Sequence, residues 1–393
     1  MKILFAFNGD FIEGNASNAR LKAYGKYLQS TGADVEFLVL RPSEFSDQSL
    51  KAHPKADLEG LSYYYLSGKT KRKKGFSRFL ELITIWSSYL KALSRNRKDA
   101  TVIYFYGAQF FTHFPILVLT KILGYKSLIE LTELHSLKKE QTPFKTIFAK
   151  LNNQFIEWTL PFWFNHVFLT SRRLLLFYKA RFKNLSSSIM PVVVDFERFE
   201  NLKNTRTNTI GYLGSFAPKD GVEGIISAFA KTFDAMQGHI KLKLIGYQPK
   251  AFNLEDLLQK HGFEKENASV EATGKVDFDE IPSHLADCDL LVMNRTSEPF
   301  SNYGFPIKLA EYMATGRPCI CTNVSDISFY FKDGIHCKII EPDNSSMLEQ
   351  IILDRYEHYN DYNMMGQNGK TKAFELFSAD YWAKEIKSVA TKL

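Results

Sequence analysis

The fold class is decided by residues 209–246, which read TIGYLGSFAPKDGVEGIISAFAKTFDAMQGHIKLKLIG. The first five of these residues are mostly apolar and read as a strand, and a turn rich in small residues follows them. Apolar residues then recur at helical spacing from Val222 to Met236, and 241–245 reads as a second strand. Strand, turn, helix and strand in this order are one repeat of a parallel, doubly wound sheet. We therefore predict an α/β fold.

The same succession of elements occurs on both sides of this stretch. The N-terminal half opens with a strand at 3–7, a Gly/Asn-rich turn and a helix at 19–31. Its further predicted strands are 35–40, 102–106, 127–131, 166–170 and 190–194. In the C-terminal half the later predicted strands are 269–272, 290–293 and 318–321. The polar segment 200–208 separates the halves, so we expect two domains in the 393 residues, 1–200 and 205–376.

The net charge of +7 is unevenly placed. Its densest cluster comprises Lys69, Lys71, Arg72, Lys73 and Lys74. Apolar residues follow at roughly helical spacing: Phe76, Phe79, Leu80, Leu82, Ile83 and Trp86. Two interpretations remain open, a solvated loop beside a packed helix or a docking site for an anionic membrane surface. Nucleic acid is not expected as a partner, because no recognition motif accompanies the charge.

The four cysteines, Cys288, Cys319, Cys321 and Cys337, lack the spacing of a metal site, and no bound metal is expected. We expect them to be free thiols that pack as small residues in the core, as is usual in a reducing compartment. The apolar run at 1–7 is too short for a signal peptide, and polar residues interrupt the one at 102–120. We expect a cytoplasmic protein, peripheral on the inner membrane face if the basic cluster docks there.

The segment 302–318, NYGFPIKLAEYMATGRP, carries the strongest functional signal. Gly304 allows a ligand to approach the backbone, and Pro306 suits the first turn of a helix. The amides of that helix N-terminus attract an anion such as a pyrophosphate. Lys308 adds a full charge where cations are otherwise unfavourable, and Glu311 follows on the same face, able to accept ribose hydroxyls. The alternative is a capped surface helix.

A second segment, the turn at 214–221, contains Gly214, Lys219 and Gly221. A lysine in such a turn, opposite the first site, would close a cage around the phosphates. Glycine-rich turns with one lysine are common, so this interpretation of Lys219 depends on the first segment.

At these residues the sequence resembles the retaining glycosyltransferases of family four, whose architecture, named GT-B, has two Rossmann-like domains facing across a cleft. The resemblance covers nearly the whole chain. Its N-terminal features are the loop with Gly14 and the segment 191–199, PVVVDFERF. Its C-terminal features are the two segments above, Gly246 and 274–276. The last residues, 377–393, resemble the family's C-terminal helix, which packs back on the first domain.

The resemblance implies a nucleotide diphosphate-sugar donor in the C-terminal domain and a glycan or lipid-linked acceptor in the N-terminal one. Lys219 and Lys308 would hold the phosphates, Glu311 the ribose, and the backbone near Val276 the base. Sugar transfer would retain the anomeric configuration, need no cofactor or metal, and serve polysaccharide or glycolipid assembly. The full set of expected donor-binding residues is Gly14, Gly214, Ser215, Lys219, Val276, Tyr303, Gly304, Phe305, Pro306, Lys308 and Glu311.

Two positions depart from the family pattern. Tyr303 stands where the family carries the first glutamate of Glu-x7-Glu, and Ser215 stands where an arginine is frequent. His135 follows a predicted strand, where the family has a histidine facing the transferred sugar. For His135 a catalytic role and a structural one remain open, and Glu133 is a rival for the catalytic role.

Three other classes of protein are alternatives to a glycosyltransferase. A dinucleotide-dependent dehydrogenase requires GxGxxG after the first strand, and residues 8–20 lack it. A nucleotide-sugar epimerase, or a subunit that binds the nucleotide sugar without turnover, remains compatible with the sequence.

Overall fold

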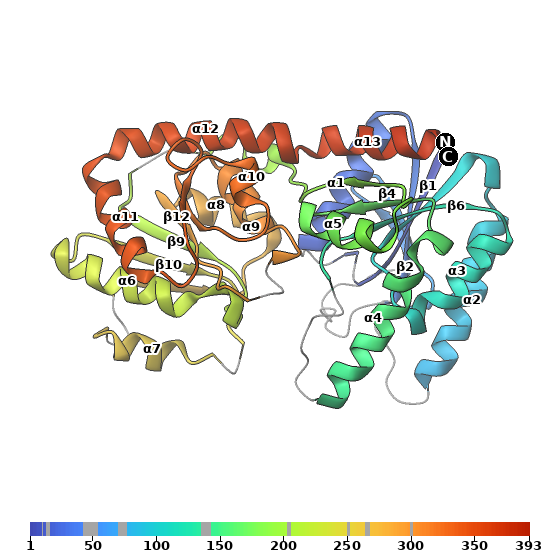
Figure 1. Ribbon diagram of the computed structural model, residues 1–393, viewed down its shortest axis with the longest axis horizontal. Coiled ribbons are helices and arrows are strands. Elements are labelled where there is room, and N and C mark those ends of the chain that lie inside the picture. The colour runs from blue at the N-terminus through green and yellow to red at the C-terminus, as the bar shows by residue number, and fades with distance from the viewer. Residues whose placement is uncertain are drawn as a thin grey trace. The chain divides into compact units, whose positions relative to one another are not determined.

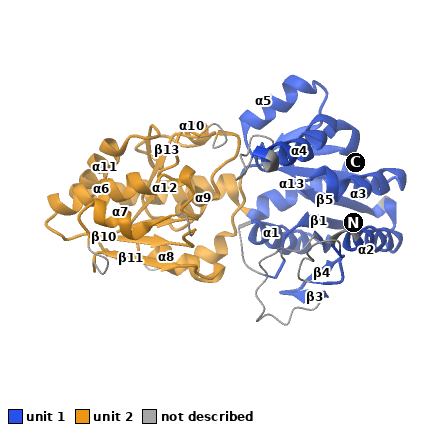
Figure 2. Ribbon diagram, turned by 90° about the horizontal axis from the view of Figure 1, so that it is seen from below, with its two compact units in different colours: residues 1–191, 379–393 blue, residues 192–378 orange. Residues whose placement is uncertain are grey.

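The computed structural model describes residues 1–9, 11–12, 16–41, 54–69, 77–134, 143–202, 206–249, 252–263, 268–298 and 302–393 (Figure 1). The chain forms two compact units (Figure 2). Unit 1 comprises residues 1–191 and 379–393, and unit 2 comprises residues 192–378. Both are parallel-sheet α/β units, as the sequence predicts.

Unit 1 is built on an eight-stranded sheet with the order β3-β4-β2-β1-β5-β6-β7-β8. Neighbouring strands run parallel except the β3–β4 pair, which is antiparallel. The strands are β1 (Lys2–Asn8), β2 (Asp34–Arg41), β3 (Lys55–Leu58), β4 (Leu61–Tyr65), β5 (Thr101–Tyr106), β6 (Lys126–Leu131), β7 (His166–Leu169) and β8 (Ser187–Ile189). The central strands β1, β5 and β6 are buried almost throughout, as expected for a parallel sheet covered on both faces.

The helices of unit 1 connect these strands, and one comes from the end of the chain. They are α1 (Ala16–Ser30), α2 (Ser77–Ser94), α3 (Phe110–Ile122), α4 (Pro143–Trp163), α5 (Arg172–Arg181) and α13 (Ala379–Thr391). Helix α13 packs on α1 and buries Ala383, Ile386 and Ala390. The ammonium of Lys387 donates a hydrogen bond to the carbonyl of Thr31, just after α1.

Unit 2 contains a six-stranded parallel sheet with the order β11-β10-β9-β12-β13-β14. Its strands are β9 (Thr209–Leu213), β10 (Lys241–Ile245), β11 (Val270–Gly274), β12 (Leu290–Met293), β13 (Cys319–Thr322) and β14 (Lys338–Ile340). From β9 the chain proceeds to one edge through β10 and β11, and it then returns to the other side of β9 at β12. The order therefore reverses between β9 and β12, and ligands of doubly wound sheets bind at such a reversal, beyond the carboxyl ends of the strands.

Side chains of the unit 2 strands alternate between two cores, one on each face. Tyr212 and Val292 join the core with α6 (Val222–Ala235), α7 (Leu254–Lys260) and α11 (Ser345–Glu357). Leu213 and Met293 join the opposite core, which also contains the free cysteines. The helices on that second side are α8 (Ile281–Ala286), α9 (Ile307–Ala314), α10 (Ile327–Tyr330) and α12 (Tyr359–Phe377).

The structure corrects the predicted boundary between the units. Residues 192–199 belong to unit 2, because Val192, Val194 and Phe199 are buried in its core. The last strand of unit 1 is β8 at Ser187–Ile189, not 190–194. The sequence analysis also missed the β3–β4 hairpin, which forms the edge of the first sheet. Among the helices that the structure describes, none is long and apolar enough to cross a membrane.

Candidate functional site

A buried ion pair joins the two segments that the sequence singled out. The Nζ atom of Lys308, in the first turn of α9, lies 2.8 Å from Oδ2 of Asp220, in the turn after β9. Gly214 makes this approach possible. A Cβ atom there would lie 2.4 Å from Lys308 Nζ and 2.0 Å from the hydroxyl oxygen of Tyr212. Any residue other than glycine would therefore displace both side chains.

Asp220 is the anion that faces Lys308, and the sequence analysis overlooked it. Its carboxylate is 2% exposed and accepts hydrogen bonds from the hydroxyls of Tyr212, at 2.9 Å, and Ser215, at 3.4 Å. Burial alone would raise the pKa of Asp220, but Lys308 and Tyr212 hold it below its usual value. Ser215 therefore contacts the carboxylate rather than replacing a missing cation.

The surroundings of Lys308 lower the pKa of its ammonium group. Burial lowers the pKa of Lys308 to about 8, although the carboxylate of Asp220 opposes this effect. The charges of Arg295 and Lys219 lower the pKa further, so two other cationic side chains lie close enough to act on Lys308. Such a cluster suits a ligand with more negative charge than one carboxylate carries.

Arg295, which the sequence analysis also missed, is positioned by the residues on either side of it. Asn294 donates a hydrogen bond to the carbonyl of Gly221 at 2.9 Å, and the amide of Thr296 donates to the carbonyl of Lys219 at 3.0 Å. Gly221 has a φ of 57°, and a Cβ there would lie 2.2 Å from the carbonyl oxygen of Asn294. The loop after β12 thus lies directly against the turn after β9, at the reversal in strand order. The position of Arg295, just after a predicted strand, was the available sequence signal.

Glu311 lies three residues after Lys308 on α9 and is 6% exposed. Burial raises its pKa to about 7, while the charges of Arg198 and Lys308 act in the opposite direction. The Nη1 atom of Arg198 lies 3.9 Å from Glu311 Oε1. Arg198 is held in place because its guanidinium stacks 3.5 Å from the ring centre of Phe278 and donates to the carbonyl of the same residue. Near neutral pH Glu311 can accept or donate a hydrogen bond.

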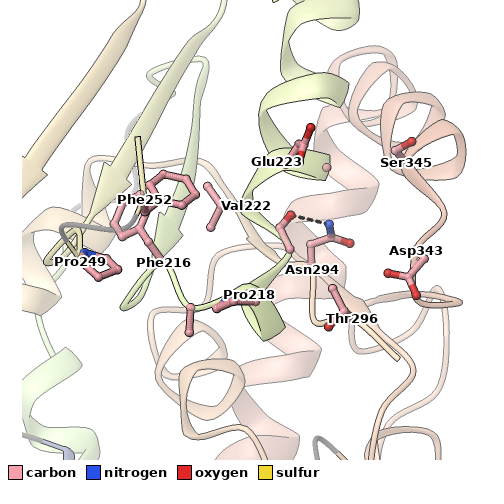
Figure 3. A pocket seen from close by; sticks show the side chains of 13 residues that line it. Phe216, Pro218, Val222, Glu223, Pro249, Phe252, Asn294, Thr296, Asp343 and Ser345 are labelled. Carbon is pink, nitrogen blue, oxygen red and sulfur yellow. Dashed lines mark hydrogen bonds between the residues drawn. The ribbon is translucent and has the colours of Figure 1, made fainter. Parts of the chain in front are cut away.

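A pocket of about 520 Å³ opens next to this cluster, entirely within unit 2 (Figure 3). The loops after β9, β10, β12 and β14 line it, with Phe216 and Phe252 on one side and Asn294 and Asp343 on the other. The turn residue Gly221 lines the pocket, but Lys219, Lys308 and Glu311 do not. The cations therefore lie beside this pocket rather than inside it.

The other residues predicted to bind the donor or act in catalysis lie around α9, in the core of unit 2, or outside the described residues. Pro306 is the N-cap residue of α9, just before its first turn, Gly304 is buried and Tyr303 is half-buried. The ring of Phe305 packs in the core, 5.2 Å from Phe377, which leaves only its backbone for a ligand. Val276 follows β11 and packs against the same core. Gly14 and His135 lie outside the described residues.

Comparisons with known proteins relate this unit to a family. Residues 193–372, most of unit 2, match the model of the family Glycosyl transferases group 1. An uncharacterized glycosyltransferase of Methanocaldococcus jannaschii is 29% identical over 159 residues, which are 40% of this chain and 41% of the relative. The chain thus matches less than half the length of this curated relative.

Solved structures resemble the fold over essentially the full length. Sucrose-phosphate synthase from Thermosynechococcus elongatus has a TM-score of 0.73 at 16% identity, covering 99% of this chain and 98% of the other. The Anabaena protein HepE in complex with UDP and glucose has a TM-score of 0.71 at 15% identity, with both chains covered completely. The fold of the two units is therefore that of GT-B structures.

Proposed function

We propose that the protein is a glycosyltransferase that moves a sugar from a nucleotide diphosphate-sugar to a hydroxyl of a glycan or lipid-linked acceptor, with retained anomeric configuration. One observation carries the proposal. Within the segment matched by the glycosyltransferase family, Lys308 and Glu311 share one face of α9 at the edge of the sheet where ligands bind. Structures of the same fold contain UDP and UDP-glucose, which agrees with such a donor.

The chemical task is to stabilise the negative charge that grows on the departing diphosphate. Lys308, Lys219 and Arg295 would supply positive charge, and the first amides of α9 would add the helix dipole. Asp220 neutralises Lys308 in the ligand-free protein, so the phosphates would compete with this carboxylate for the ammonium. Desolvated, pre-positioned charges of this kind stabilise a transition state more than mobile ones do.

Glu311 would bind the ribose. An ionised carboxylate can accept both vicinal hydroxyl protons, and Arg198 favours the ionised form of Glu311. Tyr303 takes the place of an acid at the position expected to contact the transferred sugar. Its phenol offers one donor and no negative charge, so it would select a sugar with a different hydroxyl pattern or abolish transfer.

Turnover with a panel of nucleotide sugars tests the proposal. The expected result is release of nucleoside diphosphate that depends on an acceptor extract, together with a glycosylated product whose new bond has the donor's anomeric configuration by NMR. Lys308→Met should abolish turnover. Lys241→Met is the matched control and should not affect it, because Lys241 is exposed at the start of β10, away from the carboxyl ends of the strands.

Two outcomes would refute the proposal. Conversion of the nucleotide sugar into its epimer without an acceptor would identify an epimerase. Saturable binding of nucleoside diphosphate with no turnover of any donor would identify a binding subunit, in which Tyr303 has replaced a required acid.

A further inference from the structure

Helices α3 and α4 of unit 1 pack against each other (Figure 1). Both carry large apolar side chains that are exposed. Each of these side chains has 49–61% of its surface exposed. We call them the aromatic face, comprising Phe111, Ile147, Phe148, Leu151, Trp158 and Phe162. Apolar residues gathered in this way on a surface indicate an interaction site, whereas scattered ones need no explanation.

Helix α4 is apolar on two opposite sides. Ile156 and Leu160 face the interior of unit 1 and are fully buried. Phe148, Leu151, Trp158 and Phe162 recur at intervals of three, seven and four residues, which places them along one outer stripe. Packing within unit 1 explains the inner side only, so the outer stripe needs another partner.

A groove of about 310 Å³ lies between the two helices and is lined mainly by aromatic rings. The rings of Phe111 and Phe148 stack at 4.8 Å, and those of Phe110 and Phe155 lie 4.4 Å apart. The amide of Phe111 donates to the side chain of Asn152 at 3.0 Å, which fixes the start of α3 against α4. The aromatic face is therefore a preformed surface rather than a set of independent side chains.

Cations lie within and around this face. The Nζ atom of Lys121 is 3.4 Å from the ring centre of Phe162, and the guanidinium of Arg181 is 5.0 Å from that of Trp158. Lys150, which lies between Phe148 and Leu151 in the sequence, is also exposed on α4. Helix α3 contains no acidic residue, and the single acid of α4, Glu157, is buried. Aromatic rings mixed with cations are typical of surfaces that insert at the headgroup level of a bilayer.

We propose that the aromatic face docks on an anionic lipid bilayer, with the rings among the upper acyl chains and Lys121, Lys150 and Arg181 against the headgroups. A second copy of the chain is a poorer partner, because symmetric pairing would bring these cations together without acids to neutralise them. The proposal does not depend on sugar transfer. The aromatic face comprises different residues from the docking site predicted from the sequence. Of that predicted site, Lys71, Arg72, Lys73, Lys74 and Phe76 lie outside the described residues, so docking there stays a prediction.

Vesicle co-sedimentation of the full chain tests this. The wild type should pellet with phosphatidylglycerol vesicles, pellet much less with phosphatidylcholine vesicles, and dissociate as salt rises. Leu151→Glu and Trp158→Glu should each lower the partition coefficient at least about tenfold, because they place a carboxylate in the apolar stripe. Met364→Glu is the matched control, since Met364 is equally exposed but lies in unit 2, and it should bind like the wild type.

Three results would overturn the proposal. The first is a wild type that stays in the supernatant at low salt, and the second is Leu151→Glu protein that still pellets. The third is a solution dimer, seen by light scattering, that Leu151→Glu dissociates while vesicles are ignored. Far-UV circular dichroism spectra identical to the wild type exclude misfolding of the variants as the cause of lost binding.

Discussion

Replacing Glu311 with glutamine should stabilise the ligand-free protein while it removes ribose binding. The pKa of Glu311 rises from 4.5 to about 7 on folding, chiefly because burial disfavours its charge. Between these two values the folded protein binds more protons than the unfolded chain, so the free energy of unfolding falls as the pH rises through this window. A difference of about 2.5 between the pKa values corresponds to about 3 kcal/mol well above pH 7.

A glutamine side chain is neutral at every pH and has the shape of the protonated acid, so Glu311→Gln avoids this cost. Urea unfolding followed by circular dichroism should show the variant more stable than the wild type by about 3 kcal/mol at pH 8 and by less than half of that at pH 5.5. Glu357→Gln, which replaces an exposed carboxylate on α11, is the control and should shift neither value. A pH-independent stability difference for Glu311→Gln would refute the assignment of a raised pKa to Glu311.

Three further predictions concern the ligand. Lys308→Ala should weaken nucleoside diphosphate binding by about 1.5–3 kcal/mol, roughly 10- to 150-fold by calorimetry; unchanged affinity in a folded variant would remove Lys308 from the site. The affinity for nucleoside diphosphate should be highest between about pH 7 and 8. Below about pH 7 Glu311 is protonated and accepts the ribose hydroxyls poorly, and above about pH 8 Lys308 loses the proton that attracts the phosphates. An affinity that only rises or only falls from pH 6 to 9 would contradict these two roles. Turnover should survive a chelator, since the cationic side chains and the start of α9 already supply positive charge; loss of activity that manganese or magnesium restores would contradict it.

Local patterns in the sequence were sufficient to predict most of the sheets. The strands 209–213, 241–245 and 290–293 were predicted with the bounds that the structure has, because each is a short segment rich in apolar residues that ends in a turn. The β3–β4 hairpin was missed, since its strands are short and β3 is largely exposed at the sheet edge, which leaves no apolar run. The boundary was misplaced because the buried run 192–194 resembles a strand, although its residues join the core of the next unit.

The sequence indicated the candidate site but not its charge balance. Lys308 and Glu311 were singled out because a lysine at a helix start and an acid one turn later are an unusual combination. That Asp220 would neutralise Lys308, and that Arg198 would face Glu311, depends on contacts between residues 88 and 113 positions apart. Arg295 is brought to the same place by pairing of the loops after β9 and β12, and no spacing in the sequence encodes that pairing.

The division of unit 1 into residues 1–191 and 379–393 has a consequence for synthesis. Unit 2 is continuous in the chain, so it is complete when Ser378 has been made. Unit 1 still lacks α13 at that moment, although its other residues precede unit 2 in the chain. Because domains fold as units during synthesis, unit 2 is expected to finish first, while the α13-facing surface of α1 stays open until α13 emerges from the ribosome. A stop codon after Ser378 would leave unit 2 intact and unit 1 permanently unfinished.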